Sequence, residues 1–411
     1  MADERSVSLI RLLAPLGFVV TVVGLVSSFV APFLPLYLSQ ELRAGPGLVS
    51  LFLFLMPLAA VGVATGVGRI SDRPGMRHRI LTLAAAGGCV GFLLFALVPA
   101  YWVSLAVALT LLAAAAALMP QVFAFSRTLL DRAQPSRAAT AISSLRSLLS
   151  LAWVAGPPLA AYMIGAIDFR GLFIVAAAMN LAVLPVLIRF RTSVGPEASP
   201  SGDLLLAGGA TDPTRGQLLR TSGAFVLLQC AGTLGVMSMP LFVSVDLRGD
   251  VREAGLILGL CAGLEIPFML LFGALALRWP LRRLLLLGAG IGVAYFAAMT
   301  VTGAVWHVAV AQALNACFVA AVTGLGISYF QDLLPGRLGR ATTMFTNTYR
   351  LSAMLAGLIV GAVQIAGYRF SYLIGAGLCA AGLVLLALTR PSTLVPLPVG
   401  PAQVHLDGHT V

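Results

Sequence analysis

Apolar runs long enough to cross a membrane recur along the whole chain, and this feature limits the possible folds more than any other. A helix that spans the hydrocarbon core of a bilayer needs about 20 mostly apolar residues. Runs of that kind fall at 12–38, 47–68, 80–98, 102–126, 139–165, 170–190, 220–245, 254–277, 284–303, 305–329, 341–365 and 370–389. We therefore predict an all-α membrane protein with twelve transmembrane helices.

Composition excludes the other classes of chain. Of the 411 residues, 59% are hydrophobic and 10% are charged, and the mean hydropathy is +0.98. Globular proteins are about half apolar and a quarter charged, and disordered chains and coiled coils also need far more charge than this chain has. The first apolar run is longer than the core of a signal peptide and lacks an evident cleavage site, so we expect it to remain as the first helix.

One longer polar stretch, rich in proline and glycine, interrupts the series of apolar runs between Thr192 and Gln217. It predicts two six-helix bundles joined by a linker. The expected organisation is an N-terminal bundle at 1–191, a cytoplasmic linker at 192–217, a C-terminal bundle at 218–390 and a cytoplasmic tail at 391–411.

The basic residues indicate the orientation in the membrane. All 26 are arginine, and against 15 acidic residues they give a net charge of +11. They are dispersed between the apolar runs, which argues against a nucleic-acid partner. With the N-terminus inside, 19 of the 26 arginines fall on inner segments, five on outer segments, and Arg146 and Arg350 within helices. The positive-inside rule then places both termini in the cytoplasm, and Trp102 and Trp306 at the outer interface.

An internal repeat relates the two halves. Residues 35–39 and 41–43 are echoed by 240–244 and 246–248, a shift of 205. The same shift relates Gly68 to Gly273 and Arg73 to Arg278, and residues 137–140 recur at 340–343 with a shift of 203. Such aligned patches indicate duplication of a six-helix unit. Two parallel six-helix repeats are the plan of transporters whose halves rock about a site at the membrane midplane.

The loop between the second and third predicted helices strengthens this interpretation. It contains Gly68, Ser71, Asp72, Arg73, Gly75 and Arg77. These residues resemble the motif of the major facilitator superfamily at this loop. Gly68 would allow close helix approach, and Asp72 would sit at a helix N-terminus and pair with an arginine of the other half. We expect Gly68, Asp72, Arg73, Gly75 and Arg77 to form an inner gate; in the second copy Leu277 and Pro280 replace the acid and the second glycine.

Ionisable residues inside apolar runs are candidates for function, because each costs at least about 2.5–3.5 kcal/mol at mid-depth. Glu265 is the only acid near the predicted midplane. Burial favours the protonated form of a carboxyl group, which suits a proton-coupling residue; a permanent pairing with arginine or backbone donors is the structural alternative. Arg146 is likewise either a functional residue or a permanently paired one. Arg350 either extends its guanidinium to the membrane surface or lies in a cavity.

Amides and an aromatic side chain at plausible depth suit a polar, uncharged substrate, since amides donate and accept hydrogen bonds. The candidate substrate-binding residues are Gln121, Arg146, Trp153, Gln229, Asn315 and Asn347. Each amide alone serves equally well as an interhelical hydrogen bond. We expect Asn180 to be structural.

Several longer stretches, at 119–124, 150–160, 262–267, 330–337 and 341–347, resemble the bacterial sugar efflux transporter family. The resemblance implies proton-driven export of lactose, glucose or related glycosides. By position, Gln121, Arg146, Trp153, Glu265 and Asn347 lie within or beside these stretches. In the superfamily architecture the fifth and eighth helices meet across the two halves, so Arg146 and Glu265 are expected to pair when one side is closed. Gly156-Pro157-Pro158 also resembles part of the antiporter motif of drug exporters.

Two other functions compete with sugar export. A multidrug antiporter of the same fold would use Glu265 to attract cations, and a membrane enzyme or sensor would not transport at all. No phosphate-binding loop, metal-ligand cluster or Ser/His/Asp arrangement occurs, the four histidines lie in loops or the tail, and the five cysteines lie in apolar runs. We therefore expect no enzymatic activity and no cofactor or metal. The predicted protein is a monomeric antiporter of a bacterial inner membrane that acts by alternating access.

Overall fold

A computed structural model of the chain describes residues 2–71, 76–133, 138–190 and 215–389. The described residues form helices and short connections, without strands. The first half contains α1 (Ala2–Val30), α2 (Leu34–Leu36), η1 (Tyr37–Glu41), α3 (Pro46–Ser71), α4 (Met76–Leu97), α5 (Tyr101–Val107), η2 (Ala108–Leu112), α6 (Ala113–Ala115), α7 (Leu118–Ala133) and α8 (Ala138–Phe190). The second half contains α9 (Arg215–Leu241), η4 (Phe242–Asp246), α10 (Val251–Ala276), α11 (Leu281–Val301), α12 (Val305–Leu333), α13 (Leu338–Val363) and α14 (Arg369–Ala387).

The membrane-crossing segments match the apolar runs of the sequence. Ten of the described helical segments are long and apolar enough to cross a membrane. One of them, 140–189, changes direction at Ile167 and Asp168, where the backbone leaves the helical region, and therefore crosses as two segments. α13 is more polar, but its 26 residues span about 39 Å, which is also sufficient. The predicted all-α membrane fold is confirmed.

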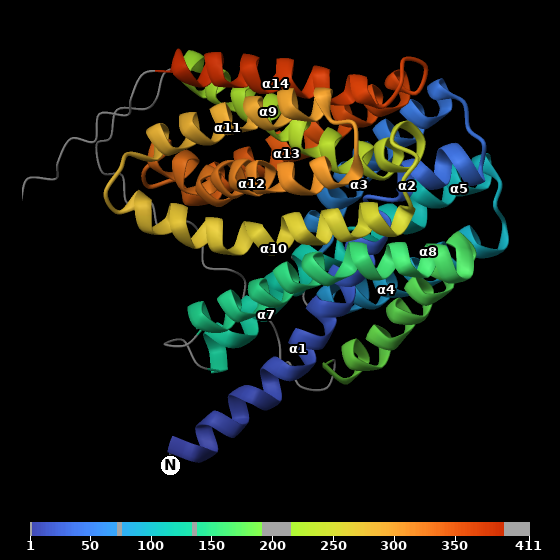
Figure 1. Cartoon of the computed structure of the whole chain (residues 1–411). Coiled ribbons are helices and arrows are strands. Elements are labelled where there is room, and N and C mark those ends of the chain that lie inside the picture. The colour runs from blue at the N-terminus through green and yellow to red at the C-terminus, as the bar shows by residue number, and fades with distance from the viewer. Residues whose placement is uncertain (1, 72–75, 134–137, 191–214, 390–411) are drawn as a thin grey trace, which may run out of the picture.

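Each half packs mainly within itself, as Figure 1 shows. α8 lies against α1 and α4 in the first half, while α9 lies against α13 and α14 in the second. Two pairs of helices make most of the contacts between the halves, α8 with α10 and α3 with α13, and α2 also lies against α9. In Figure 1 the halves approach each other at the right and diverge at the left, on the side of the N-terminus.

The backbone repeats the duplication seen in the sequence. The five-residue π-helices η1 and η4 lie 205 residues apart. Leu42 N–H donates to the Tyr37 carbonyl at 3.1 Å, and Leu247 N–H donates to the Phe242 carbonyl at 3.0 Å. The following Arg43 and Arg248 share a left-handed backbone, with φ of 48° and 55°. The two halves thus turn their chains in the same way at the same position.

Prolines break two of the predicted helices. The run at 12–38 is not one helix, because α1 ends at Val30 and a turn containing Pro32 precedes α2. Proline has no N–H and disfavours a helical residue before it. The run at 102–126 is divided among α5, η2, α6 and α7. Pro120 cannot donate to the carbonyl of Ala116, which lies in the turn between α6 and α7.

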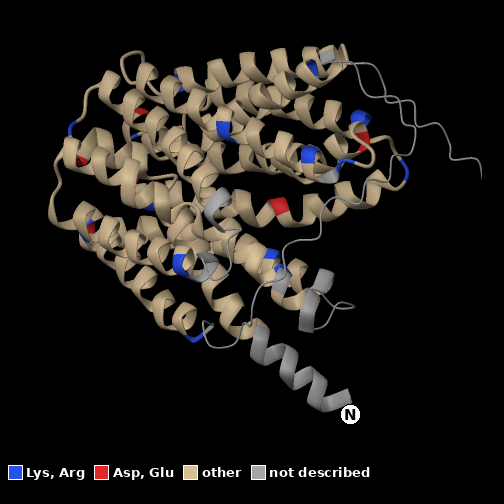
Figure 2. Cartoon of the chain, turned by 180° about the vertical axis from the view of Figure 1, so that it is seen from behind, with Lys and Arg blue, Asp and Glu red and all other residues tan. Residues whose placement is uncertain are grey.

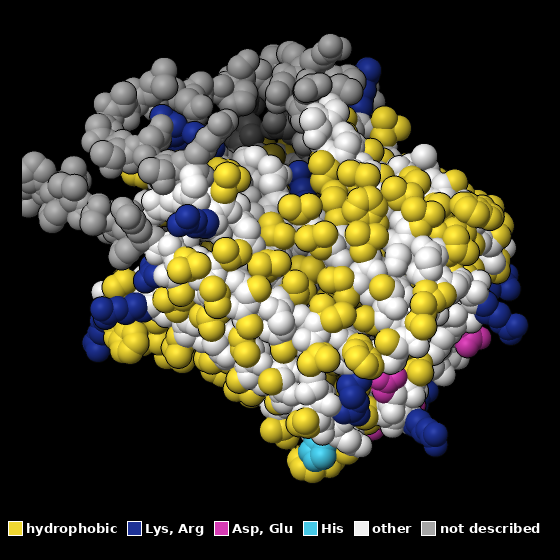
Figure 3. Space-filling view, turned by 90° about the horizontal axis from the view of Figure 1, so that it is seen from above, with side chains coloured by type: hydrophobic (Ala, Val, Ile, Leu, Met, Phe, Trp, Pro, Cys, Tyr) yellow, Lys and Arg dark blue, Asp and Glu magenta, His cyan; other side chains and the backbone are white. Residues whose placement is uncertain are grey.

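The surface is apolar where a bilayer would contact it. In Figure 3 hydrophobic side chains spread over the face in view and arginines lie towards its margins, and Figure 2 shows the charged residues mostly near helix ends. Trp102 and Trp306 are 67% and 65% exposed at the starts of α5 and α12. Their positions fit the predicted interfacial belt.

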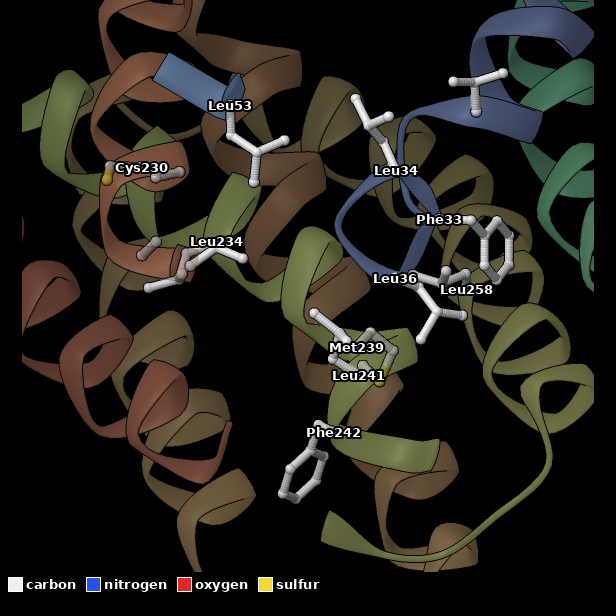
Figure 4. Packing of buried hydrophobic residues seen from close by; sticks show 14 of the residues in the cluster. Phe33, Leu34, Leu36, Leu53, Cys230, Leu234, Met239, Leu241, Phe242 and Leu258 are labelled. Atoms are coloured by element: carbon white, nitrogen blue, oxygen red, sulfur yellow. The ribbon is translucent and has the colours of Figure 1, made fainter. Parts of the chain in front are cut away.

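Apolar side chains from both halves close the end of the molecule opposite the N-terminus. Figure 4 shows Phe33, Leu34 and Leu36, which follow α1, beside Met239 of α9 and Leu258 of α10. All five side chains are buried in one cluster that includes residues of both halves. The core is therefore continuous across the interface at this end.

Arg369 anchors the same end of the second half, and its removal is expected to lower stability. Its guanidinium donates to the carbonyls of Thr300 at 2.6 Å and Thr302 at 2.8 Å, and lies 5.5 Å from the ring centroid of Phe242. Arg369→Ala should cost about 2 kcal/mol of unfolding free energy, because two carbonyls lose their charged donor. Thermal unfolding in detergent measures this. Arg170→Ala, at an exposed arginine of α8, serves as control; equal destabilisation by both variants would contradict the anchoring role.

Candidate functional site

A cavity of about 400 Å³ lies between the two halves. This volume is within the roughly 300–1,000 Å³ of small-molecule sites. Among the described residues, the first half contributes Ala31, Pro32, Trp153 and Pro157 to its lining, and the others come from the second half. The polar side chains that line it are Gln229, Thr233, Glu265, Asn315, Thr323 and Tyr349, together with the indole of Trp153 and the thiol of Cys261.

The two interface pairs of helices close the cavity on the side away from the N-terminus. A Cβ at Gly357 of α13 would lie 2.6 Å from the backbone carbonyl of Leu53 in α3, and Ser50 donates to the Leu358 carbonyl at 2.9 Å. A Cβ at Gly259 of α10 would lie 2.8 Å from the carbonyl of Val154 in α8. Glycine thus permits backbone contact at both pairs.

The same helices separate towards the N-terminal side. From 54 to 67 no described side chain of α3 is buried, and from 262 to 276 of α10 only Phe272 is buried. Interface helices that are packed at one end and exposed at the other indicate a cavity open towards the side of the N-terminus.

Glu265 lies on α10 at the cavity wall and is partly buried. Its carboxylate oxygen Oε1 accepts from the thiol of Cys261 at 3.7 Å. Among the residues that the structure describes, no arginine forms an ion pair with it. The carboxyl group is therefore directed to the cavity without a permanent counter-ion.

Gln229 of α9 lies at the cavity wall and carries an amide N–H that is unpaired within the described part of the chain. Its Oε1 accepts from the hydroxyl of Thr348, in α13, at 3.0 Å. The side chain is 5% exposed, and its Nε2 has no hydrogen-bond partner among the described residues. An unpaired buried amide costs about 1–3 kcal/mol.

Asn315 of α12 lines the cavity and is held by two hydrogen-bond acceptors. Its Nδ2 donates to Gln312 Oε1 at 2.9 Å and to Cys261 Sγ at 3.3 Å. Gln312 is in turn fixed by its Nε2, which donates to the Val308 carbonyl at 3.1 Å. Both N–H groups of Asn315 are thereby used, which leaves its carbonyl oxygen as the group offered to the cavity.

The structure brings together Trp153, Gln229, Glu265 and Asn315 of the residues singled out from sequence. Gln121 of α7 and Asn347 of α13 are not among the cavity-lining residues; Asn347 is exposed, and Oε1 of Gln121 is buried without a partner among the described residues. Arg146 does not line the cavity either. It precedes Trp153 by seven residues, about two turns, and therefore lies on the same face of α8, towards the open side.

Tyr349 and Cys261 are cavity residues that sequence reasoning did not single out. Tyr349 adjoins Arg350, and its phenol within an amphipathic helix was the available signal. A cysteine inside an apolar run carries no comparable signal, because buried cysteine commonly acts as a small apolar residue.

The corresponding region of the first half is mostly apolar, with Ser27 and Asn180 as the polar side chains among its described lining residues. A second cavity of about 280 Å³ is lined by α1, α3, α4 and neighbouring segments, and it shares Ala31 and Met237 with the first. The 205-residue shift relates Glu265 to Ala60 and Cys261 to Met56, and both counterparts line this second cavity. Among the described residues, the pair formed by Glu265 and Cys261 therefore has no polar counterpart in the first half.

The predicted inner gate falls largely outside the described residues. Asp72, Arg73 and Gly75 are not described, while Gly68 lies in α3 and Arg77 in α4. In the described part of the chain no group of three or more His, Cys, Asp and Glu side chains could hold a metal ion.

Comparison with known proteins agrees with this architecture. The Major Facilitator Superfamily family matches residues 16–308 and 221–406. The solved structure of a mutant of the nucleoside transporter NupG superposes with a TM-score of 0.76 at 14% identity, over 92% of this chain and 100% of that one. A POT family transporter in complex with 5-aminolevulinic acid superposes with a TM-score of 0.73 at 14% identity, over 93% and 97% of the two chains. At these identities the likeness concerns the fold.

Relatives with similar sequences identify the family more specifically. A putative sugar efflux transporter of Deinococcus radiodurans is 36% identical over 92% of this chain and 98% of that protein. Sugar efflux transporter A of Escherichia coli is 32% identical over 89% and 93% of the two chains. The fold and the central cavity thus define a multi-pass membrane transporter. The chain belongs to the major facilitator superfamily and, within it, to the sugar efflux transporters.

Proposed function

We propose that this protein exports sugars, such as lactose, glucose or related glycosides, in exchange for protons. The central observation is a cavity whose wall combines the amide of Gln229, the carboxyl group of Glu265 and the aromatic ring of Trp153. Sugar hydroxyls require groups that donate and accept, and the apolar face of a sugar ring suits an indole. The names of the relatives support the substrate class.

Alternating access supplies the transport cycle. With both termini in the cytoplasm of a bacterium, the open side of the cavity faces inward and the α3–α13 and α8–α10 contacts close the outer side. Sugar enters from the cytoplasm, the halves rock about the cavity, and the outer contacts separate. Asp72, Arg73 and Arg77 would then close the inner side, and Arg146 would approach Glu265.

Glu265 provides the proton step. In the absence of a counter-ion, a carboxyl group at membrane depth is more stable when protonated. Sugar leaves to the outside as Glu265 takes up a proton there, and the proton is released inside before the next sugar binds. Without the proton, the charged carboxyl group is available to accept hydrogen bonds from the next sugar.

Trp153 should report sugar binding directly. Of the first-half residues that the structure describes, it is the one aromatic residue lining the cavity. Trp153→Ala is expected to weaken sugar binding about tenfold, since the stacking surface is lost. Sugar should change the intrinsic fluorescence of the wild-type protein, and Trp153→Phe should lose this change. Trp102→Phe, at a surface position, should keep it; loss in both variants would argue against stacking on Trp153.

The substrate class is tested by transport in proteoliposomes. Labelled lactose, labelled glucose and a cationic dye are offered separately under an imposed pH gradient. We expect gradient-dependent movement of a sugar and none of the dye. Movement of the dye without either sugar would identify a multidrug antiporter, and the amides would then be interhelical contacts.

A further inference from the structure

We propose that Cys261 is a positioning residue that links the protonation of Glu265 to the orientation of Asn315, so that loss of the proton prepares the site for sugar. This inference rests on the proposed function and adds the route by which proton and sugar exclude each other. A chain of hydrogen bonds supports it, from Gln312 through Asn315 and Cys261 to Glu265.

The donor and acceptor of each hydrogen bond in this chain are determined by the groups involved. Gln312 is fully buried, and a bond to its own helix holds its amide, so its Oε1 is a stationary acceptor. Asn315 Nδ2 has two N–H groups and only donates, so Cys261 Sγ must accept from it. The single proton of the thiol is then directed to Glu265 Oε1.

This arrangement requires an acceptor at Glu265. While the carboxyl group is ionised, the thiol donates a charge-assisted hydrogen bond, which strengthens the sulfur as acceptor for Asn315. Asn315 then keeps its carbonyl oxygen towards the cavity, ready to accept from a sugar hydroxyl. When Glu265 is protonated, the thiol loses its charged acceptor, the hold on Asn315 weakens, and the sugar loses an ordered partner.

Few other titratable groups compete for this role. On the surrounding helices they are Tyr349 of α13, which lines the cavity, Tyr295 of α11, which is within electrostatic range of Cys261, and Arg146 of α8 on the open side. None forms an ion pair with Glu265 in the described part of the chain. In the first half the positions equivalent to Cys261 and Glu265 are Met56 and Ala60, so the chain of bonds belongs to one half.

The hydrogen bond between Cys261 and Glu265 is tested by the reactivity of the Cys261 thiol. This measurement requires no sugar. In a protein whose other four cysteines are replaced by alanine, maleimide labels Cys261 at pH 8. Glu265→Gln should raise the labelling rate about tenfold, because the thiolate no longer forms beside a negative charge. Glu253→Gln, at the far end of α10, should leave the rate unchanged. Equal labelling rates in the Glu265→Gln variant and in the protein that keeps Glu265 would show that Cys261 does not contact Glu265.

The positioning role is tested by lactose binding between pH 5 and 8. Wild-type affinity should fall as the pH is lowered, while Cys261→Ala should bind about tenfold more weakly at pH 8 and lose most of the pH dependence. Cys261→Ser, which keeps a donor, should restore both, and Cys317→Ala should match the wild type. In a Glu265→Gln background Cys261→Ala should have no further effect.

The outcomes separate the two proposals. A Cys261→Ala profile identical to the wild type, or additive effects of the two substitutions, would overturn the positioning role and leave sugar export intact. Absence of wild-type lactose and glucose binding at every pH would refute the proposed function, while the labelling rates would still decide whether Cys261 is joined to Glu265.

Discussion

Replacement of Glu265 by glutamine is expected to reduce transport driven by a pH gradient at least about 100-fold, while exchange of sugar for sugar continues. Glutamine has the shape of the acid and can accept from the Cys261 thiol, but it cannot carry a proton. A cycle that needs net proton movement therefore stops, whereas rocking with bound sugar does not require that step. Counterflow of labelled sugar and gradient-driven uptake, measured in the same proteoliposomes, separate the two activities.

Glu253→Gln is the matched control for this experiment. Glu253 lies on the same helix and accepts from the backbone N–H of Asp250 at 2.9 Å, as part of the capping box of α10. Glutamine retains that function, so both activities should be unchanged. If Glu265→Gln lost exchange and driven uptake equally, Glu265 would have a structural role; if it lost neither, the coupling role would be wrong.

Replacement of Gly357 by alanine is expected to prevent closure on the side away from the N-terminus and to lower transport at least about tenfold. Its Cβ would lie 2.6 Å from the backbone of Leu53, which cannot move without shifting α3. The closed arrangement described here becomes unfavourable, and the population moves to a conformation in which α3 and α13 are apart. Spin labels at the exposed positions Arg43 and Ile365 should report a longer distance than in the unsubstituted background.

Gly273→Ala serves as the control for Gly357→Ala. A Cβ at Gly273 of α10 would meet no atom within 4 Å, so alanine should leave both the label distance and transport unchanged. An unaltered distance in Gly357→Ala, with normal transport, would contradict the idea that backbone contact at this glycine closes the cavity.

The sequence predicted the fold well because a bilayer allows few solutions. Backbone groups in hydrocarbon must be satisfied within the segment, so each long apolar run becomes a helix. The duplicated patches at 35–43 and 240–248 also reappear as structure, in the π-helices η1 and η4 and the turns after them. The interruptions near Pro32 and Pro120 were not predicted, since hydropathy averages over proline.

The site was predicted only in part, because the sequence does not fix how each helix is rotated about its own axis. Polarity within apolar runs identified Glu265, Gln229, Asn315 and Trp153, which all line the cavity. The same criterion identified Gln121 and Asn347, which do not line it. Which face of a helix meets the cavity depends on packing against neighbouring helices, as at Gly357 and Gly259, and a single sequence does not encode those contacts locally.

The open side of the cavity was also beyond sequence reasoning, because both conformations of a transporter satisfy the same hydropathy pattern. The structure settles it through burial: α3 and α10 are packed at one end and exposed at the other.

The exchange of sugar for protons is tested most directly by reversing the driving force. Proteoliposomes are loaded with lactose and a pH-sensitive dye, diluted into lactose-free buffer of the same pH, and clamped at zero membrane potential. Outflow of sugar should acidify the interior, and Glu265→Gln should abolish the acidification. Sugar outflow without any change of internal pH in the wild-type protein would contradict proton exchange.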